Sequence, residues 1–175
     1  PQIGYIPNAP AIFAAANGWV AVFGNGYNAS KSDSHADTTG EGALIVVDLL
    51  TGAVERTLLT GKKAANDPTG ANRPNTVTEP VVADADLDGV ADYLYSGDLF
   101  GNVWKVDLDG DSIDDWAFSP TDSGDAPKPL FRAVSREGTA QPITVRPSVA
   151  HHPDGGLLVM VGTGKYVETS DTSVT

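Results

Sequence analysis

The sequence predicts an all-β protein, a β-propeller of which this chain makes about three blades, as a piece of a larger propeller. Three observations lead to this fold class. The apolar segments are short, rich in Val, Ile, Leu and aromatic residues, and bracketed by Gly, Asn, Asp or Pro, which is typical of strands and turns. No window has the 3.6-residue apolar period of an amphipathic helix. Short motifs also recur about every 70 residues, as expected for blades of similar construction.

Eight segments are expected to form strands, and they lie at 11–15, 19–23, 43–49, 77–83, 93–96, 103–108, 146–150 and 157–162. Two of them, at 43–47 and 157–161, are apolar without alternation, which predicts strands covered on both faces. The core strands should be 19–23, 43–49, 93–96, 103–108 and 157–161. Trp104 should be a buried anchor of this core.

The repeat is visible in three proline-containing segments, Ala-Pro-Ala-Ile (9–12), Glu-Pro-Val-Val (79–82) and Arg-Pro-Ser-Val (146–149). Their prolines are 70 and 67 residues apart, and an apolar strand ending in glycine follows each segment. In the first two repeats a third strand ends in Val-Asp-Leu, at 47–49 and 106–108. We therefore interpret 1–175 as one partial propeller domain, with repeats at approximately 1–70, 71–140 and 141–175, the last of them incomplete.

Three polar stretches separate the predicted strands. Those at 30–41 and 62–75 are rich in Ser, Asp, Thr, Asn and Gly, which predicts mobile surface loops. In the third stretch, 111–128, Trp116 and Phe118 indicate that part of the segment packs against the core.

Composition excludes several functions. A net charge of −12 argues against a nucleic-acid partner or an anionic membrane face. No apolar run is long enough for a transmembrane helix. The absence of cysteine excludes disulfides, thiol catalysis and Cys-based metal sites. Because the chain begins with Pro1 and shows no signal-peptide pattern, we expect it to be a piece of a longer protein.

The strongest motif is the acidic segment Asp-Ala-Asp-Leu-Asp-Gly-Val-Ala-Asp at 84–92. It places oxygen ligands at loop positions 1, 3, 5 and 9, a backbone carbonyl at 7 and glycine at 6, which is the arrangement of a calcium loop. Tyr95 replaces the Glu expected at position 12, and the flanks are strands rather than helices. The sequence therefore predicts a Ca²⁺ site outside an EF-hand, with ligands Asp84, Asp86, Asp88, Asp92 and the Val90 carbonyl.

A second acidic segment repeats the 1, 3, 5, 9 spacing with Asp107, Asp109, Asp111 and Asp115. Its glycine, Gly110, stands at position 4 rather than 6, so the turn is not that of a calcium loop. An acidic turn and a second ion site both remain open for this segment, with the turn favoured.

The chain offers little for catalysis. Gly-Asn-Gly-Tyr-Asn-Ala (24–29) follows a strand as in dinucleotide sites, but the residues after it have no helical apolar period. No serine stands in a nucleophile-elbow context, and the carboxylates occur as clusters of acceptors. We therefore expect no catalytic turnover and no bound redox cofactor.

The motifs together resemble a known family. Residues 79–108, with the calcium loop and Gly-Asp-Leu-x-Gly-Asn-x-Trp (97–104), resemble the C-terminal propeller of the PilC/PilY type IV pilus tip adhesins. Further similar segments, in the same order, are 19–28, 47–54, 141–144 and 161–166. The resemblance implies calcium ligation by the five residues named above. The second acidic segment is not part of the family pattern.

The resemblance also implies a function. The protein would be a surface protein of the bacterial pilus tip, with outer-membrane association, that is needed for pilus assembly and for adhesion to a host or abiotic surface. Its partners would be minor pilins, and its calcium loop would take part in the control of pilus extension and retraction. Two alternatives stay open. Val-Asp-Leu-Leu-Thr-Gly (47–52) also resembles the blades of PQQ-dependent quinoproteins, and a metal-free propeller that docks proteins would share the fold.

Overall fold

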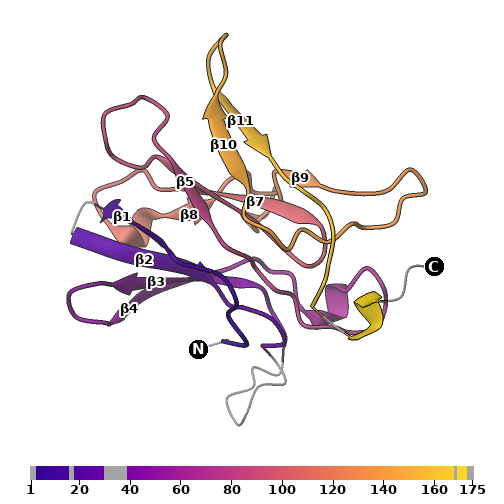
Figure 1. Ribbon diagram of the computed structural model, residues 1–175. Helices are drawn as coiled ribbons and strands as arrows, with labels where there is room; N and C mark the ends of the chain where they lie inside the picture. Colours follow the sequence, from indigo (N-terminus) through magenta and orange to yellow (C-terminus); the bar gives the residue numbers. More distant parts are fainter. Residues whose placement is uncertain (1–2, 16–17, 30–38, 168, 173–175) are drawn as a thin grey trace.

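The computed structural model describes residues 3–15, 18–29, 39–167 and 169–172. In these ranges the chain forms three antiparallel sheets that follow one another along the sequence (Figure 1). The helical elements of this part of the chain are three short 3₁₀ helices, η1 (Ala64–Asn66), η2 (Ile113–Asp115) and η3 (Thr169–Thr172). The prediction of an all-β fold is therefore confirmed.

The first sheet has the strand order β1-β2-β3-β4. Its strands are β1 (Ala11–Ala15), β2 (Gly18–Gly24), β3 (Ala43–Asp48) and β4 (Val54–Leu59). The first three coincide with predicted strands, and β3 is buried over most of its length, as its unbroken apolar run indicates. The sequence analysis missed β4, because Val-Glu-Arg-Thr-Leu-Leu has no continuous apolar run.

The second sheet follows the order β5-β6-β7-β8, and β9 also pairs with β7. Its strands are β5 (Val81–Ala83), β6 (Tyr93–Gly97), β7 (Asn102–Asp107), β8 (Ala117–Phe118) and β9 (Phe131–Arg132). The predicted strand at 77–83 is shorter than expected, since the ladder begins only after Pro80, which has no N–H to donate. Val77 instead forms an isolated bridge with Asp98.

The third sheet contains only β10 (Ser148–His151) and β11 (Leu157–Met160). The prediction that 157–161 is a core strand covered on both faces is wrong. Leu157 and Val159 pack against the second sheet around Tyr95, whereas Leu158 and Met160 are 43% and 53% exposed. Among the described residues, the sheet has a neighbour on one face only, so its side chains alternate between contact and solvent.

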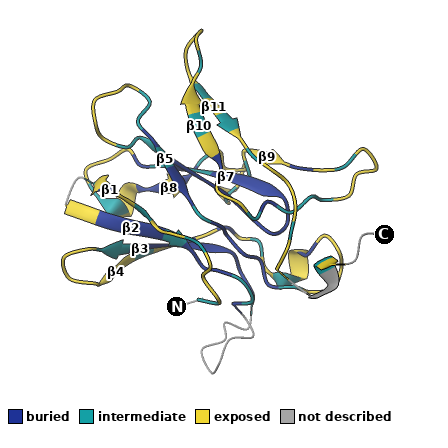
Figure 2. Cartoon of the chain, in the orientation of Figure 1, coloured by how far each residue is buried: buried dark blue, intermediate teal, exposed yellow. Residues whose placement is uncertain are grey.

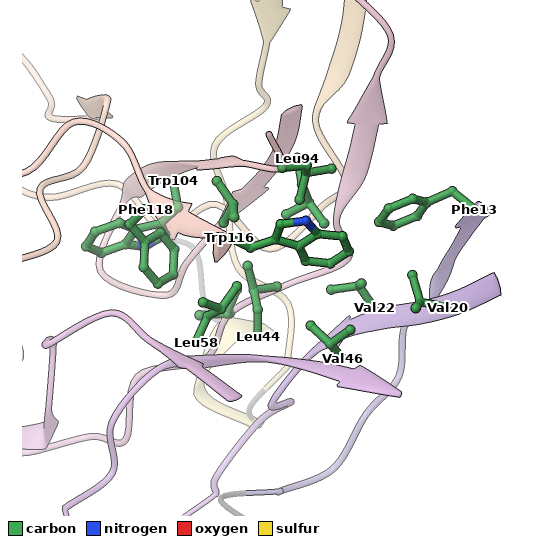
Figure 3. Packing of buried hydrophobic residues seen from close by; sticks show 13 residues of the cluster. Phe13, Val20, Val22, Leu44, Val46, Leu58, Leu94, Trp104, Trp116 and Phe118 are labelled. Atoms are coloured by element: carbon green, nitrogen blue, oxygen red, sulfur yellow. The ribbon is translucent and has the colours of Figure 1, made fainter. Parts of the chain in front are cut away.

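The main core lies between the first and second sheets (Figures 2 and 3). Trp104 is fully buried there, which confirms the predicted anchor, and its ring meets the edge of Phe118 at a centroid distance of 5.3 Å. Trp116 stacks on Phe13 at 5.8 Å, which joins the two sheets. The prediction that Trp116 and Phe118 pack down is thus confirmed.

One aromatic residue of a predicted core strand is exposed. Trp19 is the second residue of β2, opposite Ala14 of β1, and is 61% exposed. Val20 and Val22 of the same strand enter the main core, so Trp19 projects from the other face of the sheet. The prediction that 19–23 is a core strand is confirmed by Val20 and Val22, and Trp19 is its exposed first residue.

Close packing explains why glycine ends the second strand of each of the first two repeats, at Gly24 in β2 and Gly97 in β6. A Cβ atom on Gly24 would lie 1.9 Å from the Val77 carbonyl oxygen, and one on Gly97 would lie 2.3 Å from Ile143. The residue after each glycine is hydrogen-bonded to the residue that the glycine packs against. Asn25 Oδ1 accepts from the Val77 N–H, and the Asp98 carbonyl accepts from the Ile143 N–H, both at 3.0 Å. Glycine thus lets the chain enter the next repeat in contact with the previous one.

The structure departs in part from the prediction of mobile surface loops. Residues 30–38 of the first lie outside the described residues. In the second, Asp67 is buried and accepts two hydrogen bonds from the Arg73 guanidinium, from Nε at 3.0 Å and Nη2 at 2.9 Å. Asn75 is fully buried as well. The expectation of a mobile surface loop at 62–75 is therefore wrong around these residues, because internal polar contacts fold the segment.

The Asp67–Arg73 pair predicts acid sensitivity. Burial alone would raise the pKa of the Asp67 carboxyl, but the hydrogen bonds from Arg73 and Thr69 outweigh it and hold this pKa well below its ordinary value. The pair therefore stabilises the fold above the unfolded-state pKa of about 4, and this stabilisation is lost as the pH falls below it. Asp67→Asn should lower the free energy of unfolding by about 1.5–3 kcal/mol at neutral pH.

Urea unfolding from pH 7 down to pH 2 measures this effect. The stability of Asp67→Asn should fall less steeply with acid than that of the wild type, so that the two curves converge. The exposed substitution Glu137→Gln is the control and should follow the wild type. Parallel curves for Asp67→Asn and wild type would contradict the stabilising role of the pair.

Candidate metal site

The predicted calcium loop connects β5 to β6 in the second sheet. The two strands pair from Val81 opposite Tyr95 to Ala83 opposite Tyr93, and the Asp92 N–H donates to the Ala83 carbonyl at 2.9 Å. Residues 84–91 therefore form the loop of a β-hairpin with a fixed base.

Backbone N–H groups hold the acidic side chains in place within the loop. Asp84 accepts hydrogen bonds from the N–H groups of Asp88 at 3.1 Å and Gly89 at 2.8 Å. Asp86 also accepts from the Asp88 N–H at 3.1 Å, and Asp88 accepts from the Val90 N–H at 2.8 Å. Gly89 has φ +94°, a conformation that glycine adopts without strain, so the glycine at position 6 makes the turn as expected.

This turn gathers three of the predicted ligands. Asp84, Asp86 and Asp88 each offer a carboxylate oxygen within 4.8 Å of the others, and of the residues described they make the one such group of three. Asp86 and Asp88 are exposed and Asp84 is half-buried, so an ion could reach them from solvent. The donor set fits Ca²⁺, a hard cation that prefers oxygen ligands and accepts irregular geometry.

Asp92 lies at the base of the loop. Its carboxylate accepts a hydrogen bond from the Ala85 N–H, and its carbonyl accepts one from the Leu108 N–H at 2.8 Å. It is outside the group of three, although its side chain reaches back to the start of the loop. Val90 is 52% exposed on the same loop, and ligation by Val90 and Asp92 stays a prediction.

The second acidic segment has a different structure. Asp107 accepts from the Asp109 N–H at 3.1 Å, while Asp115 accepts from the Ser112 N–H at 3.2 Å at the start of η2. Along the described ranges, these four carboxylates do not form a group of the kind made by Asp84, Asp86 and Asp88. The acidic turn favoured by the displaced glycine agrees with this arrangement.

The two acidic segments are nevertheless neighbours. Asp107 is the main cause of a raised pKa of the Asp109 carboxyl, followed by burial and then by the charge of Asp92. Tyr93 pairs with Asp107 across β6 and β7, and Lys105 lies over the Tyr93 ring with its Nζ 3.6 Å from the centroid. A cation bound in the loop at 84–91 would therefore reduce the repulsion among the carboxylates of both acidic segments.

Sequence analysis gave no role to Asp98, which the structure places at the centre of a buried network. One carboxylate oxygen accepts from the N–H groups of Phe100 at 2.9 Å and Asn102 at 2.8 Å. The other accepts from the side chains of Asn102 at 2.8 Å, Trp104 at 2.9 Å and Asn75 at 3.0 Å. Gly-Asp-Leu-x-Gly-Asn-x-Trp is thus a structural motif that ties the turn between β6 and β7 to Trp104.

Antiparallel sheets that follow one another along the chain, the first two packed face to face and the second carrying an acidic hairpin loop between β5 and β6, define this chain as a segment of a β-propeller with a candidate cation site. Across the described residues, no helix is both long and apolar enough to cross a membrane.

The chain matches the family described as PilY1 beta-propeller domain over residues 1–175 and belongs to it. It is 39% identical to the type IV pilus biogenesis factor PilY1 of Pseudomonas aeruginosa PAO1, over 98% of this chain and 15% of that protein. It is 35% identical to a PilY1 homolog of Xylella fastidiosa, over 98% of this chain and 11% of that protein. The crystal structure of the Pseudomonas aeruginosa PilY1 C-terminal domain matches with a TM-score of 0.76 and 35% identity. That match covers all of this chain and 35% of the solved chain. The resemblance to pilus-associated propellers is confirmed.

Proposed function

We propose that this chain is the calcium-binding part of a propeller that acts in type IV pilus biogenesis at the bacterial cell surface. The carrying observation is the group formed by Asp84, Asp86 and Asp88, held by backbone N–H groups on the hairpin loop between β5 and β6. Membership of the PilY1 beta-propeller family supports the pilus role, because the relatives are type IV pilus biogenesis factors.

Calcium would change the energetics of the loop. The three gathered carboxylates repel one another, and Asp92 adds a fourth negative charge at the base. Ca²⁺ takes six to eight oxygens, so the loop carboxylates, the Val90 carbonyl, and water or a neighbouring carbonyl would complete its shell. Mg²⁺ should substitute poorly, because it requires a tight octahedron and gives up its waters reluctantly.

The loop is connected to the rest of the blade through Asp92. This residue joins the loop to β5 by its N–H, and to the segment after β7 through the bond from Leu108 to its carbonyl. Further along that segment, the Ile113 carbonyl accepts a hydrogen bond from Arg56 of β4 at 2.8 Å. Calcium binding would thus stabilise the edge of the second sheet where it meets the first. It would also affect the binding of any partner at that edge.

The family role extends the proposal to partners and location. We assign the chain to the pilus tip, with outer-membrane association, minor pilins as partners, and a part in adhesion and in the control of extension and retraction. Of the alternatives, a PQQ-dependent enzyme would yield a bound quinone with its own absorbance. A metal-free docking propeller would not respond to calcium. We expect neither a quinone nor enzymatic turnover.

Calcium titration calorimetry tests the site directly. The wild-type chain should bind one Ca²⁺ with a Kd of about 10⁻⁴–10⁻⁵ M, and Asp88→Ala should abolish this binding. The matched control is Asp111→Ala, which removes an exposed carboxylate from the other acidic segment and should leave binding intact. Equal binding by Asp88→Ala and wild type would contradict the site, and loss of binding in both variants would place the ion between the two segments.

The pilus role needs a separate measurement in the bacterium that carries the full-length protein. A deletion of residues 79–108 should abolish surface pili, whereas Asp88→Ala should alter their number or length with the protein still present at normal levels. Normal piliation after the deletion would contradict a role in pilus biogenesis, whatever the outcome of the calcium titration.

A further inference from the structure

The chain contains three Asp-Gly dipeptides, at 88–89, 109–110 and 154–155. Among aspartate-containing sequences, Asp-Gly rearranges most readily, because glycine has no side chain to hinder attack by its own amide nitrogen. All six residues are exposed, so exposure does not distinguish the three sites.

The rearrangement is a defined reaction. The glycine nitrogen attacks the side-chain carboxyl carbon of the preceding Asp, a C–N bond forms, the C–OH bond breaks, and the amide proton leaves with the hydroxyl as water. Water then opens the resulting succinimide at either carbonyl, which gives Asp or isoaspartate of unchanged mass. No oxidant, reductant or other reactant is required.

The three sites differ in how the attacking amide is held. The Gly89 N–H donates to the Asp84 carboxylate at 2.8 Å, and the Gly155 N–H donates to the His152 carbonyl at 3.0 Å. The Gly110 N–H makes no hydrogen bond with any part of the chain that the structure describes. Gly110 also has φ +122° in the segment between β7 and η2, where it lies against the Asp115 side chain but no ladder fixes the backbone.

The side chains of Asp88 and Asp109 differ in the same direction, whereas the Asp154 carboxyl, like that of Asp109, accepts no backbone hydrogen bond within the described residues, so the fold protects Asp154 through its glycine amide alone. Asp88 is held in a turn by the bond from the Val90 N–H to its Oδ1. Asp109 has its own N–H bonded to Asp107 but no backbone donor on its carboxyl group within the described residues. Attack at Asp109 therefore requires no backbone hydrogen bond to open first.

We propose that Asp109–Gly110 is a site of spontaneous isoaspartate formation in the folded protein, and that the fold protects the other two Asp-Gly sequences. A hydrogen bond of ordinary net strength slows a reaction that must first break it by about 2- to 12-fold. Isoaspartate should accumulate at Asp109 faster than at Asp88 or Asp154 by a factor in this range.

The modification would alter the backbone of the second acidic segment, next to the candidate calcium loop. Isoaspartate adds one methylene to the main chain and removes one from the side chain. The insertion would follow directly after Leu108, whose N–H bonds the Asp92 carbonyl at the base of the candidate calcium loop. Ageing at this position would thus disturb the contact between the two acidic segments.

The test is peptide mapping of the purified chain after incubation at 37 °C and neutral pH, in native buffer and in 8 M urea. The three sites fall in different tryptic peptides, 64–105, 106–132 and 137–165, because Arg73, Lys128 and Arg146 precede proline. Electron-transfer fragmentation then distinguishes isoaspartate from Asp, because only isoaspartate has its Cα–Cβ bond in the main chain and gives the fragments of that cleavage. In native buffer we expect the excess at Asp109, and in urea the three sites should react at similar rates.

Asp109→Glu should remove the signal from peptide 106–132, while Asp154→Glu should leave it unchanged. Thermal melting of both variants checks that the fold is intact. Equal isoaspartate at the three sites in native buffer would overturn the proposal. So would an Asp109 excess that persists unchanged in urea, because local sequence rather than the fold would then set the rate.

Discussion

Asp98→Asn, which replaces one carboxylate oxygen by an NH₂ group, should lower the free energy of unfolding by about 2–6 kcal/mol. Burial raises the pKa of the Asp98 carboxyl, and the surrounding N–H donors, led by those of Asn102 and Asn75, offset part of that effect. All five hydrogen bonds to Asp98 come from N–H groups, two on one oxygen and three on the other. Whichever way an Asn side chain turns, its NH₂ group faces at least two of these donors, and each buried donor left unsatisfied costs about 1–3 kcal/mol.

Urea unfolding at pH 7 measures the loss, with Glu137→Gln as an exposed carboxyl-to-amide control that should stay within about 0.5 kcal/mol of wild type. A cost under 1 kcal/mol for Asp98→Asn at pH 7 would contradict the structural role of the network.

Trp104→Ala should cost about 3–5 kcal/mol, as large-to-small changes of core aromatic residues do. The indole is fully buried between the first and second sheets, in contact with Phe118, and its Nε1 donates to Asp98 at 2.9 Å. The change therefore opens a cavity in the main core and removes one donor of the network at the same time.

Trp104→Phe separates these two effects, because it keeps most of the apolar contact and loses only the N–H and part of the ring. We expect it to cost clearly less than Trp104→Ala. A double-mutant cycle of Trp104→Phe with Asp98→Ala isolates the energy of coupling between the two side chains, expected at about 0.5–3 kcal/mol. Additive costs in this cycle would show that Trp104 acts by packing alone.

The fold could be predicted from the sequence to the level of strands and repeats. Strands β2, β3, β6 and β7 are apolar enough to be located by their runs, and turn residues delimit them. Strand β4 could not be found, because its Glu-Arg-Thr centre lies on a partly exposed edge.

Burial was predicted less well, for a geometric reason. An apolar run shows that a strand has apolar side chains on both faces, but whether both faces are covered depends on which neighbouring sheets are present. β3 is covered on both faces, whereas Leu158 and Met160 of β11 are on a face without a neighbour among the described residues. Trp19 of β2 is exposed although Ala21 and Ile45, on the same face of the first sheet, are buried, so the cover on that face is only partial. The local sequence carries no signal for this difference.

The candidate site followed closely from spacing. The acids at loop positions 1, 3 and 5 meet because glycine at position 6 turns the backbone, and the structure gathers Asp84, Asp86 and Asp88 accordingly. The same spacing in the second acidic segment gathers no such group, since its glycine is displaced and η2 takes Asp115 into a helix cap. Asp98 could not be predicted from spacing, because Asn75, one of its five donors, comes from a segment distant in sequence.

Thermal melting with and without calcium tests the central claim, which is that the hairpin loop between β5 and β6 binds a calcium ion that stabilises the fold. Millimolar calcium at a Kd of about 10⁻⁴–10⁻⁵ M adds about 1.4–2.7 kcal/mol to a state that alone binds the ion. For a chain of this size, that corresponds to a rise in Tm of about 3–11 °C over the value in EGTA. Asp88→Ala should show no calcium-dependent rise, whereas Asp111→Ala should rise like the wild type. If wild type and Asp88→Ala melt at the same temperature in EGTA and in calcium, the loop is a solvated acidic turn and binds no stabilising ion.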